Sequence, residues 1–209
     1  VFNGRDGEWS AKLVPESAKK ASLEPVRQTR AQVEVPDLTL LFAPLKKART
    51  DFVVEKACEL GVRQIQPVMT EWTQASRVRT DRLQATVIEA AEQTERMDIP
   101  VVLEDMPLAK ALDTWDSGVP LYYCDEAGEG SAMADVLSTA GRGGPAGLLI
   151  GPEGGFSPAE RKMLRSLDFV VPVTLGPRIL RAETAVVAAL TLWQSSVGDW
   201  QHNPYLPEN

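Results

Sequence analysis

The chain has 209 residues, of which 44% are hydrophobic and 24% are charged, and its formal net charge is −7. This composition is ordinary for a globular protein, and the negative charge argues against a protein that coats nucleic acid without specificity. No apolar run approaches the roughly 20 residues that a membrane-spanning helix needs. One histidine and two cysteines exclude a histidine-based metal site and a disulfide framework, so we expect no metal, and buried free thiols suit a reducing cytoplasm.

Residues 1–35 differ in pattern from the rest of the chain. Turn residues at 3–7 precede segments that alternate loosely between apolar and polar side chains, as a half-exposed strand does. We therefore expect a small β-rich segment at 1–35 and place a domain boundary at 36–37, with a second domain over 36–209.

Strands and helices alternate from residue 38 onward. Helices are expected to begin at Thr50–Asp51, ending before Gly61, and at Thr80–Asp81. Others are expected over 107–115 and 131–140, after the capping box of Ser157 and Glu160, and from Ala182 to Trp193. Apolar runs predict strands at 38–43, 62–69, 99–104, 119–125, 146–151 and 169–175. This alternation predicts an α/β fold, a parallel sheet with helices on both faces.

Charge is distributed unevenly along this second part. Residues 83–140 hold two Lys or Arg against twelve Asp or Glu, whereas residues 36–82 hold eight against six. A local basic face on an acidic protein is one interpretation, and an ordinary solvated surface is the other.

Three strand ends carry unusual residues, at 122–130, 150–156 and 175–185. Ligands of open α/β sheets bind beyond the carboxyl ends of strands. The spacing of Gly151, Gly154 and Gly155 matches neither a dinucleotide fingerprint nor a P-loop. Acidic residues near these ends would repel a polyphosphate: Asp125, Glu126, Glu129 and Glu153. S-adenosylmethionine, with its sulfonium, ammonium and ribose, suits such a site; the alternative is that the glycines only make a tight turn.

The third strand end, 176–181, contains two arginines at the start of a helix. Arg178 and Arg181 oppose the positive end of the helix dipole there. They indicate a site for a phosphate or a developing anion, or else a structural pairing with Glu183 or a nearby acidic loop.

Two long motifs, LLIGPEGGFSPAE (148–160) and LGPRILRAETA (175–185), resemble the SPOUT class of RNA methyltransferases. They are most similar to the RsmE family, which methylates N3 of a uridine in 16S ribosomal RNA of the small subunit. Residues 46–68 and 89–100 are also similar to that family, and residues 1–35 resemble the later half of its N-terminal PUA-like, RNA-binding β-barrel. The resemblance implies a C-terminal trefoil knot built from 151–156, 176–181 and the last helix, and a homodimer.

The resemblance also implies where S-adenosyl-L-methionine would bind. The matching positions are Tyr123, Gly151, Pro152, Glu153, Gly154, Gly155, Leu175, Gly176, Ile179, Leu180 and Ala185. The basic cluster at 46–49 and the helix carrying Gln93 and Arg96 are candidates for contact with the RNA. The positions assigned to RNA are Lys46, Arg49, Gln93 and Arg96; the alternatives are a solvated surface and, for Arg96, a pair with Glu92.

N3 of uracil is protonated at neutral pH, so methylation there needs a base and stabilisation of the resulting anion. Arg178 and Arg181 are the candidates for anion stabilisation, and Glu183 or Glu153 for the base. The alternative for Glu183 is an ion pair that holds Arg181. Three other functions stay open: a nucleotide-dependent α/β enzyme, an RNA-binding module without activity, and a SPOUT enzyme acting on transfer RNA.

Overall fold

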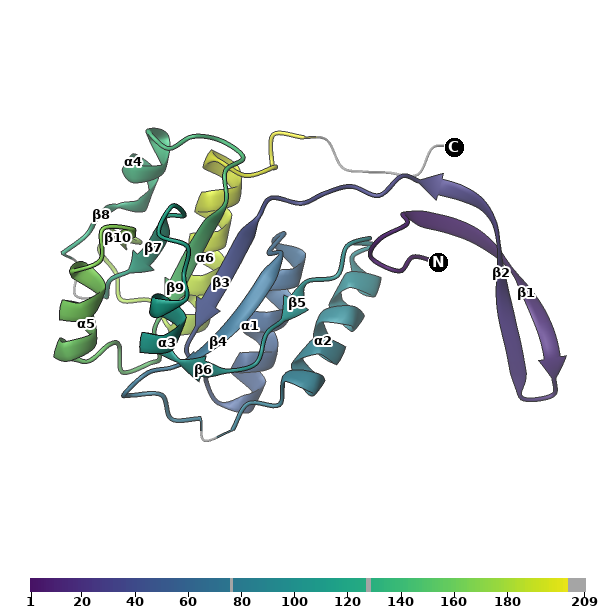
Figure 1. The fold of residues 1–209 in the computed structure, drawn as a ribbon, viewed down its shortest axis with the longest axis horizontal. Coiled ribbons are helices and arrows are strands. Elements are labelled where there is room, and N and C mark those ends of the chain that lie inside the picture. Colours follow the sequence, from purple (N-terminus) through teal and green to yellow (C-terminus); the bar gives the residue numbers. More distant parts are fainter. Residues whose placement is uncertain (76, 127–128, 203–209) are drawn as a thin grey trace.

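The computed structural model of the protein describes residues 1–75, 77–126 and 129–202. It contains a two-stranded sheet of β1 (Glu8–Ser17) and β2 (Lys20–Arg30) and a separate eight-stranded sheet (Figure 1). The strands of the larger sheet are β3 (Leu38–Phe42), β4 (Gln64–Met69), β5 (Val101–Val102), β6 (Met106–Pro107), β7 (Leu121–Cys124), β8 (Ser131–Ala132), β9 (Ala146–Ile150) and β10 (Val170–Thr174).

Every strand pair of the larger sheet is parallel. Its order is β5-β4-β3-β9-β7-β10-β8, with β6 also paired to β4. Parallel neighbours need crossover connections, which explains why helices separate the strands along the chain. The predicted parallel α/β fold is confirmed.

Helices pack on both faces of this sheet. They are α1 (Lys47–Glu59), α2 (Thr80–Gln93), α3 (Leu108–Asp113), α4 (Met133–Ser138), α5 (Pro158–Arg165) and α6 (Ala182–Ser196). Leu40 and Leu148 join one buried cluster with residues of α1, α2, α4 and α6, whereas Leu41 and Leu149 join another with residues of α3 and α5. Successive strand residues thus point into opposite cores, as expected for a sheet buried on both faces.

The start of α1 and the capping role of Thr80 differ from the prediction. α1 begins at Lys47 instead of Thr50, and the hydroxyl of Thr50 bonds the N–H and the carbonyl of Leu45, both at 2.9 Å. α2 begins at Thr80, so Thr80 is inside the helix and its hydroxyl donates to Glu104 (2.7 Å). Neither threonine caps its helix: Thr50 bonds the segment just before α1, and Thr80 bonds a side chain 24 residues away.

The capping box before α5 is confirmed. Ser157 Oγ accepts from the N–H of Glu160 (3.2 Å), and Glu160 Oε2 accepts from the N–H of Ser157 (2.9 Å). The strand expected over 99–104 is reduced to the two residues of β5, followed by the short β6.

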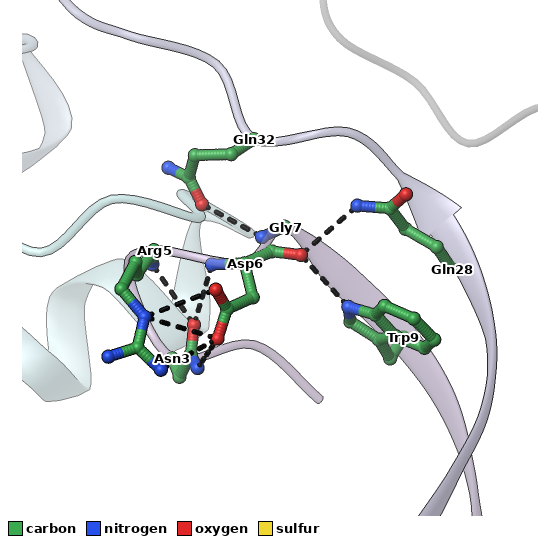
Figure 2. Close-up of polar contacts among 7 residues, drawn as sticks. All are labelled: Asn3, Arg5, Asp6, Gly7, Trp9, Gln28 and Gln32. Atoms are coloured by element: carbon green, nitrogen blue, oxygen red, sulfur yellow. Dashed lines mark hydrogen bonds and ion pairs between the residues drawn. The ribbon is translucent and has the colours of Figure 1, made fainter.

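The β1–β2 ribbon projects from one side of the body (Figure 1). At its base, the carbonyl of Asp6 accepts from Trp9 Nε1 (2.8 Å) and Gln28 Nε2 (3.1 Å), and the N–H of Gly7 donates to Gln32 (3.1 Å; Figure 2). Gly7 has φ +75°, and a Cβ there would lie 2.4 Å from the carbonyl oxygen of Arg30. The expectation of β structure within residues 1–35 is therefore correct.

Over the described residues, none of the helices is long and apolar enough to cross a membrane.

Candidate active site

The carboxyl ends of four adjacent strands, β3, β9, β7 and β10, meet at one edge of the sheet. In their registers Phe42 lies opposite Ile150, Tyr123 opposite Leu149, and Val173 opposite Cys124. The loops that follow these strands therefore lie side by side, although they are distant in sequence. This edge is where parallel sheets bind ligands.

Two hollows open among these loops, of about 530 and 630 Å³. Both are lined by the same five residues, so they are parts of one site: Cys124, Glu126, Ile179, Leu180 and Ala185. The first extends along 173–178 and the second along 150–155, where it also reaches Lys46, Arg49 and Gln74. We call the two hollows together the strand-end site.

All predicted cofactor positions except Tyr123 line the strand-end site. Tyr123 is fully buried behind it. Its ring packs edge-on against Phe156 at 5.2 Å between centroids, and its hydroxyl donates to Asp125 (3.2 Å). Burial, reinforced by Glu126 and Asp125, raises the pKa of Tyr123 well above its usual range, so the phenol stays neutral.

Two of the three glycines in the 151–155 loop, Gly151 and Gly155, are required by its geometry. Gly155 has φ +73°, and its N–H donates to the carbonyl of Pro152 (2.9 Å). A Cβ at Gly151 would lie 2.6 Å from the ring of Phe156. The N–H of Phe156 donates to Glu126 Oε1 (3.0 Å), which ties this loop to the end of β7. The tight turn and the lining of a ligand site are thus properties of the same loop.

Arg49 connects the two carboxylates that the sequence offered as bases. Its Nη1 lies 2.9 Å from Glu153 Oε1, and its Nε lies 3.9 Å from Glu183 Oε1. The second oxygen, Glu183 Oε2, is buried and has no hydrogen-bond partner among the described residues. The pairing considered from sequence, Glu183 with Arg181, is replaced by this one with Arg49.

Arg178 and Arg181 are exposed at the rim of the strand-end site. Arg178 lines the first hollow and Arg181 the second, and neither forms an ion pair with a described residue. Ile179, between them, is 97% exposed. Two free guanidinium groups and an apolar side chain are therefore presented to a ligand.

An acidic network that the sequence did not reveal supports the other wall. Asp125 is buried and pairs with Arg165 of α5, which also pairs with Glu129. Burial raises the pKa of the neighbouring Cys124 thiol to about 12. Arg165 lies 40 residues from Asp125, and no local pattern links them. Ala127 and Gly128, within the predicted acidic strand end at 122–130, lie outside the described residues.

The two RNA candidates expected on one helix lie outside the strand-end site, and only Gln93 belongs to α2, because the helix ends before Arg96. Gln93 is exposed at the last residue of the helix. Arg96 pairs with Asp98 instead of Glu92, and its guanidinium donates to the carbonyls of Cys58 and Val62, the latter at 2.7 Å. Arg96 thus braces the end of α1 against its neighbours, and its contact with RNA stays a prediction.

Comparisons with known proteins support one family. The family model described as an RNA methyltransferase domain matches residues 33–194. A ribosomal RNA small subunit methyltransferase E from Rickettsia conorii is 30% identical over 190 residues, which cover 91% of this chain and 77% of that protein.

Two solved structures are similar over nearly the whole chain. The ribosomal RNA small subunit methyltransferase E from Neisseria gonorrhoeae, bound to S-adenosyl methionine, is 32% identical, with a TM-score of 0.84 over 95% of this chain and 83% of that one. A putative methyltransferase from Legionella pneumophila, also with bound cofactor, is 28% identical, with a TM-score of 0.80 over 95% and 82%. The chain therefore belongs to the RNA methyltransferase domain family and, within it, to the small-subunit ribosomal RNA methyltransferase E group.

Proposed function

We propose that the protein transfers a methyl group from S-adenosyl-L-methionine to N3 of a uridine in 16S ribosomal RNA of the small subunit. The observation that carries this proposal is the strand-end site, in which the loops 151–155 and 175–180 come together. The names of the relatives give the RNA class, and the position N3 comes from the two motifs that resemble the RsmE family.

The chemistry of the strand-end site fits S-adenosylmethionine. Its walls combine carboxylates, Glu126 and Glu153, with the exposed backbone of a glycine-rich loop and apolar side chains of 179–180. Carboxylates attract an ammonium and a sulfonium, ribose hydroxyls can donate to them, and backbone groups can bond the edge of adenine. When bound, S-adenosylmethionine supplies an electrophilic methyl group.

The protein must then remove the N3 proton of uracil and stabilise the anion on N3, O2 and O4. Glu183 lines neither hollow, but of the two candidate bases it is favoured. Glu153 is held by Arg49 at 2.9 Å, whereas Glu183 Oε2 has no hydrogen-bond partner among the described residues. The guanidinium groups of Arg178 and Arg181 stabilise the uracil anion or a neighbouring phosphate. Holding both reactants in one site supplies the near-attack geometry.

The finer architecture is part of the same proposal. Loops 151–156 and 176–181 with α6 form a trefoil knot, and the domain boundary lies at 36–37, with residues 1–35 belonging to a PUA-like barrel that binds RNA. The protein acts as a cytoplasmic homodimer. The exposed Ile179 supports a partner or a ligand that covers this loop. The proposed RNA contacts are Lys46, Arg49, Gln93 and Arg96.

Methyl transfer from labelled S-adenosylmethionine to small subunits and to free 16S RNA, followed by mapping of the modified base, tests this function. We expect label on N3 of one uridine, and no label in small-subunit RNA would reject the proposal. Binding of S-adenosylmethionine without transfer would favour the inactive RNA-binding module. A response to NAD or ATP in place of S-adenosylmethionine would favour the nucleotide-dependent enzyme.

Single-turnover rates of methylation test the catalytic roles of Arg181 and Glu183. We expect Arg181→Ala and Glu183→Gln each to slow single-turnover methylation by about 100-fold, the range for loss of an anion-stabilising donor or a general base. Lys162→Ala, at an exposed position of α5, is the matched control. If both variants methylate at the control rate, these assignments are wrong.

A further inference from the structure

A separate hollow of about 520 Å³ lies beside the strand-end site, and we call it the basic pocket. It is bounded by the β3–α1 connection, the segment after β4 and the starts of α1 and α2. Five of its twelve lining residues are Lys or Arg, and none is Asp or Glu: Lys46, Lys47, Arg77, Arg79 and Arg82. The pocket therefore concentrates positive charge on a protein whose net charge is −7.

Among the described residues, two of these five cations have acidic partners. Arg82 pairs with Asp51 (2.6 Å), and Arg79 pairs with Asp81 (2.7 Å). Over the described residues, the other three, two lysines and Arg77, form no ion pair. Like charges gathered at one pocket repel one another unless an anion joins them, so the pocket is suited to an anionic ligand.

The start of α1 adds to this attraction. Lys46 is the N-cap residue of the 13-residue helix, no side chain caps it, and the first turn has no acidic residue. Cations at a helix N-terminus oppose the helix dipole and cost stability when nothing offsets them. An anion in the pocket would be attracted by these lysines and by the dipole together.

The basic pocket adjoins the strand-end site. Lys46 and Gln74 line both the pocket and the second hollow. A ligand group held in the pocket is thus next to a nucleotide placed in the strand-end site. In a nucleic-acid substrate, the group next to a nucleotide is a backbone phosphate.

We propose that the basic pocket binds a backbone phosphate of the RNA strand, adjacent to the nucleotide that enters the strand-end site, with Lys47 and Arg77 as its main cationic contacts. This inference rests on the proposed function and assigns a position for the substrate strand. Phosphate contacts fix register and carry no sequence information, so the pocket positions the RNA and does not select the base.

The test compares Lys47→Gln/Arg77→Gln with Lys110→Gln/Arg142→Gln, which removes the same two charges from exposed positions outside the pocket. We expect the pocket variant to bind 16S RNA about ten-fold more weakly, as for a lost contact to a charged group. The slope of log Kd against log salt should fall by about 1 for the lost phosphate contact. The affinity for S-adenosylmethionine should be unchanged, and KM for RNA should rise more than kcat falls.

An uncharged linkage in the RNA backbone locates the phosphate that the pocket contacts. Replacing one phosphodiester beside the target uridine by a methylphosphonate should weaken binding to the wild-type protein and to the control, and should add nothing in the pocket variant. Equal salt slopes for the pocket and control variants would overturn the inference while leaving the proposed function standing. If the pocket variant loses binding of inorganic phosphate but binds RNA as the wild-type protein does, the inference is also overturned, in favour of a site for a free anion. Absence of methylation by the wild-type protein would instead reject the proposed function.

Discussion

The glycine pair of the 151–155 loop gives a sharp test of how the strand-end site is built. Replacing Gly155 by alanine should destabilise the protein, because its φ of +73° disfavours any side chain and because a Cβ would lie 2.3 Å from Glu126 Oε1. Gly154→Ala should be nearly neutral. Its Cβ would meet only Trp72, at an ordinary 3.7 Å, and its φ is not in the left-handed region.

The magnitude follows from two contributions. A non-glycine residue in the left-handed region costs about 1–2 kcal/mol. Moving Glu126 away sacrifices its hydrogen bond from the N–H of Phe156, worth about 1 kcal/mol for a carboxylate that is 39% exposed. We therefore expect Gly155→Ala to lower the free energy of unfolding by about 2–3 kcal/mol.

Urea denaturation followed by far-UV circular dichroism measures the difference. The two contributions separate in a Glu126→Ala background, where Gly155→Ala should cost only the backbone strain, about 1–2 kcal/mol. If Gly155→Ala is as mild as Gly154→Ala, the loop does not depend on this turn and the reasoning is refuted. An equal cost in both backgrounds would show that Glu126 does not hold the loop.

Three further predictions concern a close backbone contact, a partly buried ion pair and a buried thiol. Gly130→Ala would place a Cβ 2.6 Å from backbone atoms of 172–173 and should destabilise by about 1–3 kcal/mol in urea denaturation, whereas Gly141→Ala, with open space around it, should stay within about 0.5 kcal/mol. Arg165→Leu leaves the buried Asp125 without this partner and should lower the free energy of unfolding by about 2 kcal/mol. The loss is smaller than for a fully buried ion pair because Arg165 is 33% exposed. An unchanged urea midpoint would contradict this prediction. Burial raises the pKa of the Cys58 thiol to about 11, so the thiol stays protonated at pH 8. Iodoacetamide should therefore label Cys58 only after unfolding. Rapid labelling of the native protein would show that the thiol is accessible.

The fold was predictable from sequence because its signals are local. Buried parallel strands read as short apolar runs, and the capping box at Ser157 and Glu160 is a contiguous pattern. The errors lie where tertiary contacts override local rules. Thr50 and Thr80 have the chemistry of N-caps, but their hydroxyls bond Leu45 and Glu104 instead.

The candidate site was predictable only in part. Glycines and arginines in long motifs identified the loops, since their spacing is visible in one dimension. Partnerships between loops were not, because Arg49 and Glu153 are 104 residues apart and meet only through the order β3-β9 of the sheet. The sequence indicated only the lysines of the basic pocket, at 46–47, because its arginines come from a segment about 30 residues later that sequence alone does not bring beside them.

The role of Arg49 changes how the carboxylate in the glycine-rich loop is understood. One guanidinium faces two carboxylates, from the loop after β9 and from the start of α6. A third carboxylate, Glu126, lines the same hollow as Arg49 and has the guanidinium of Arg161 3.9 Å away. Each of these three carboxylates therefore has an arginine within 4 Å, whereas Arg178 and Arg181 at the rim form no ion pair with a described residue. An anionic RNA strand suits the rim, where these two guanidinium groups are exposed. In the proposed function, the loop carboxylate Glu153 therefore anchors Arg49, and the two rim arginines are the cations available to the RNA.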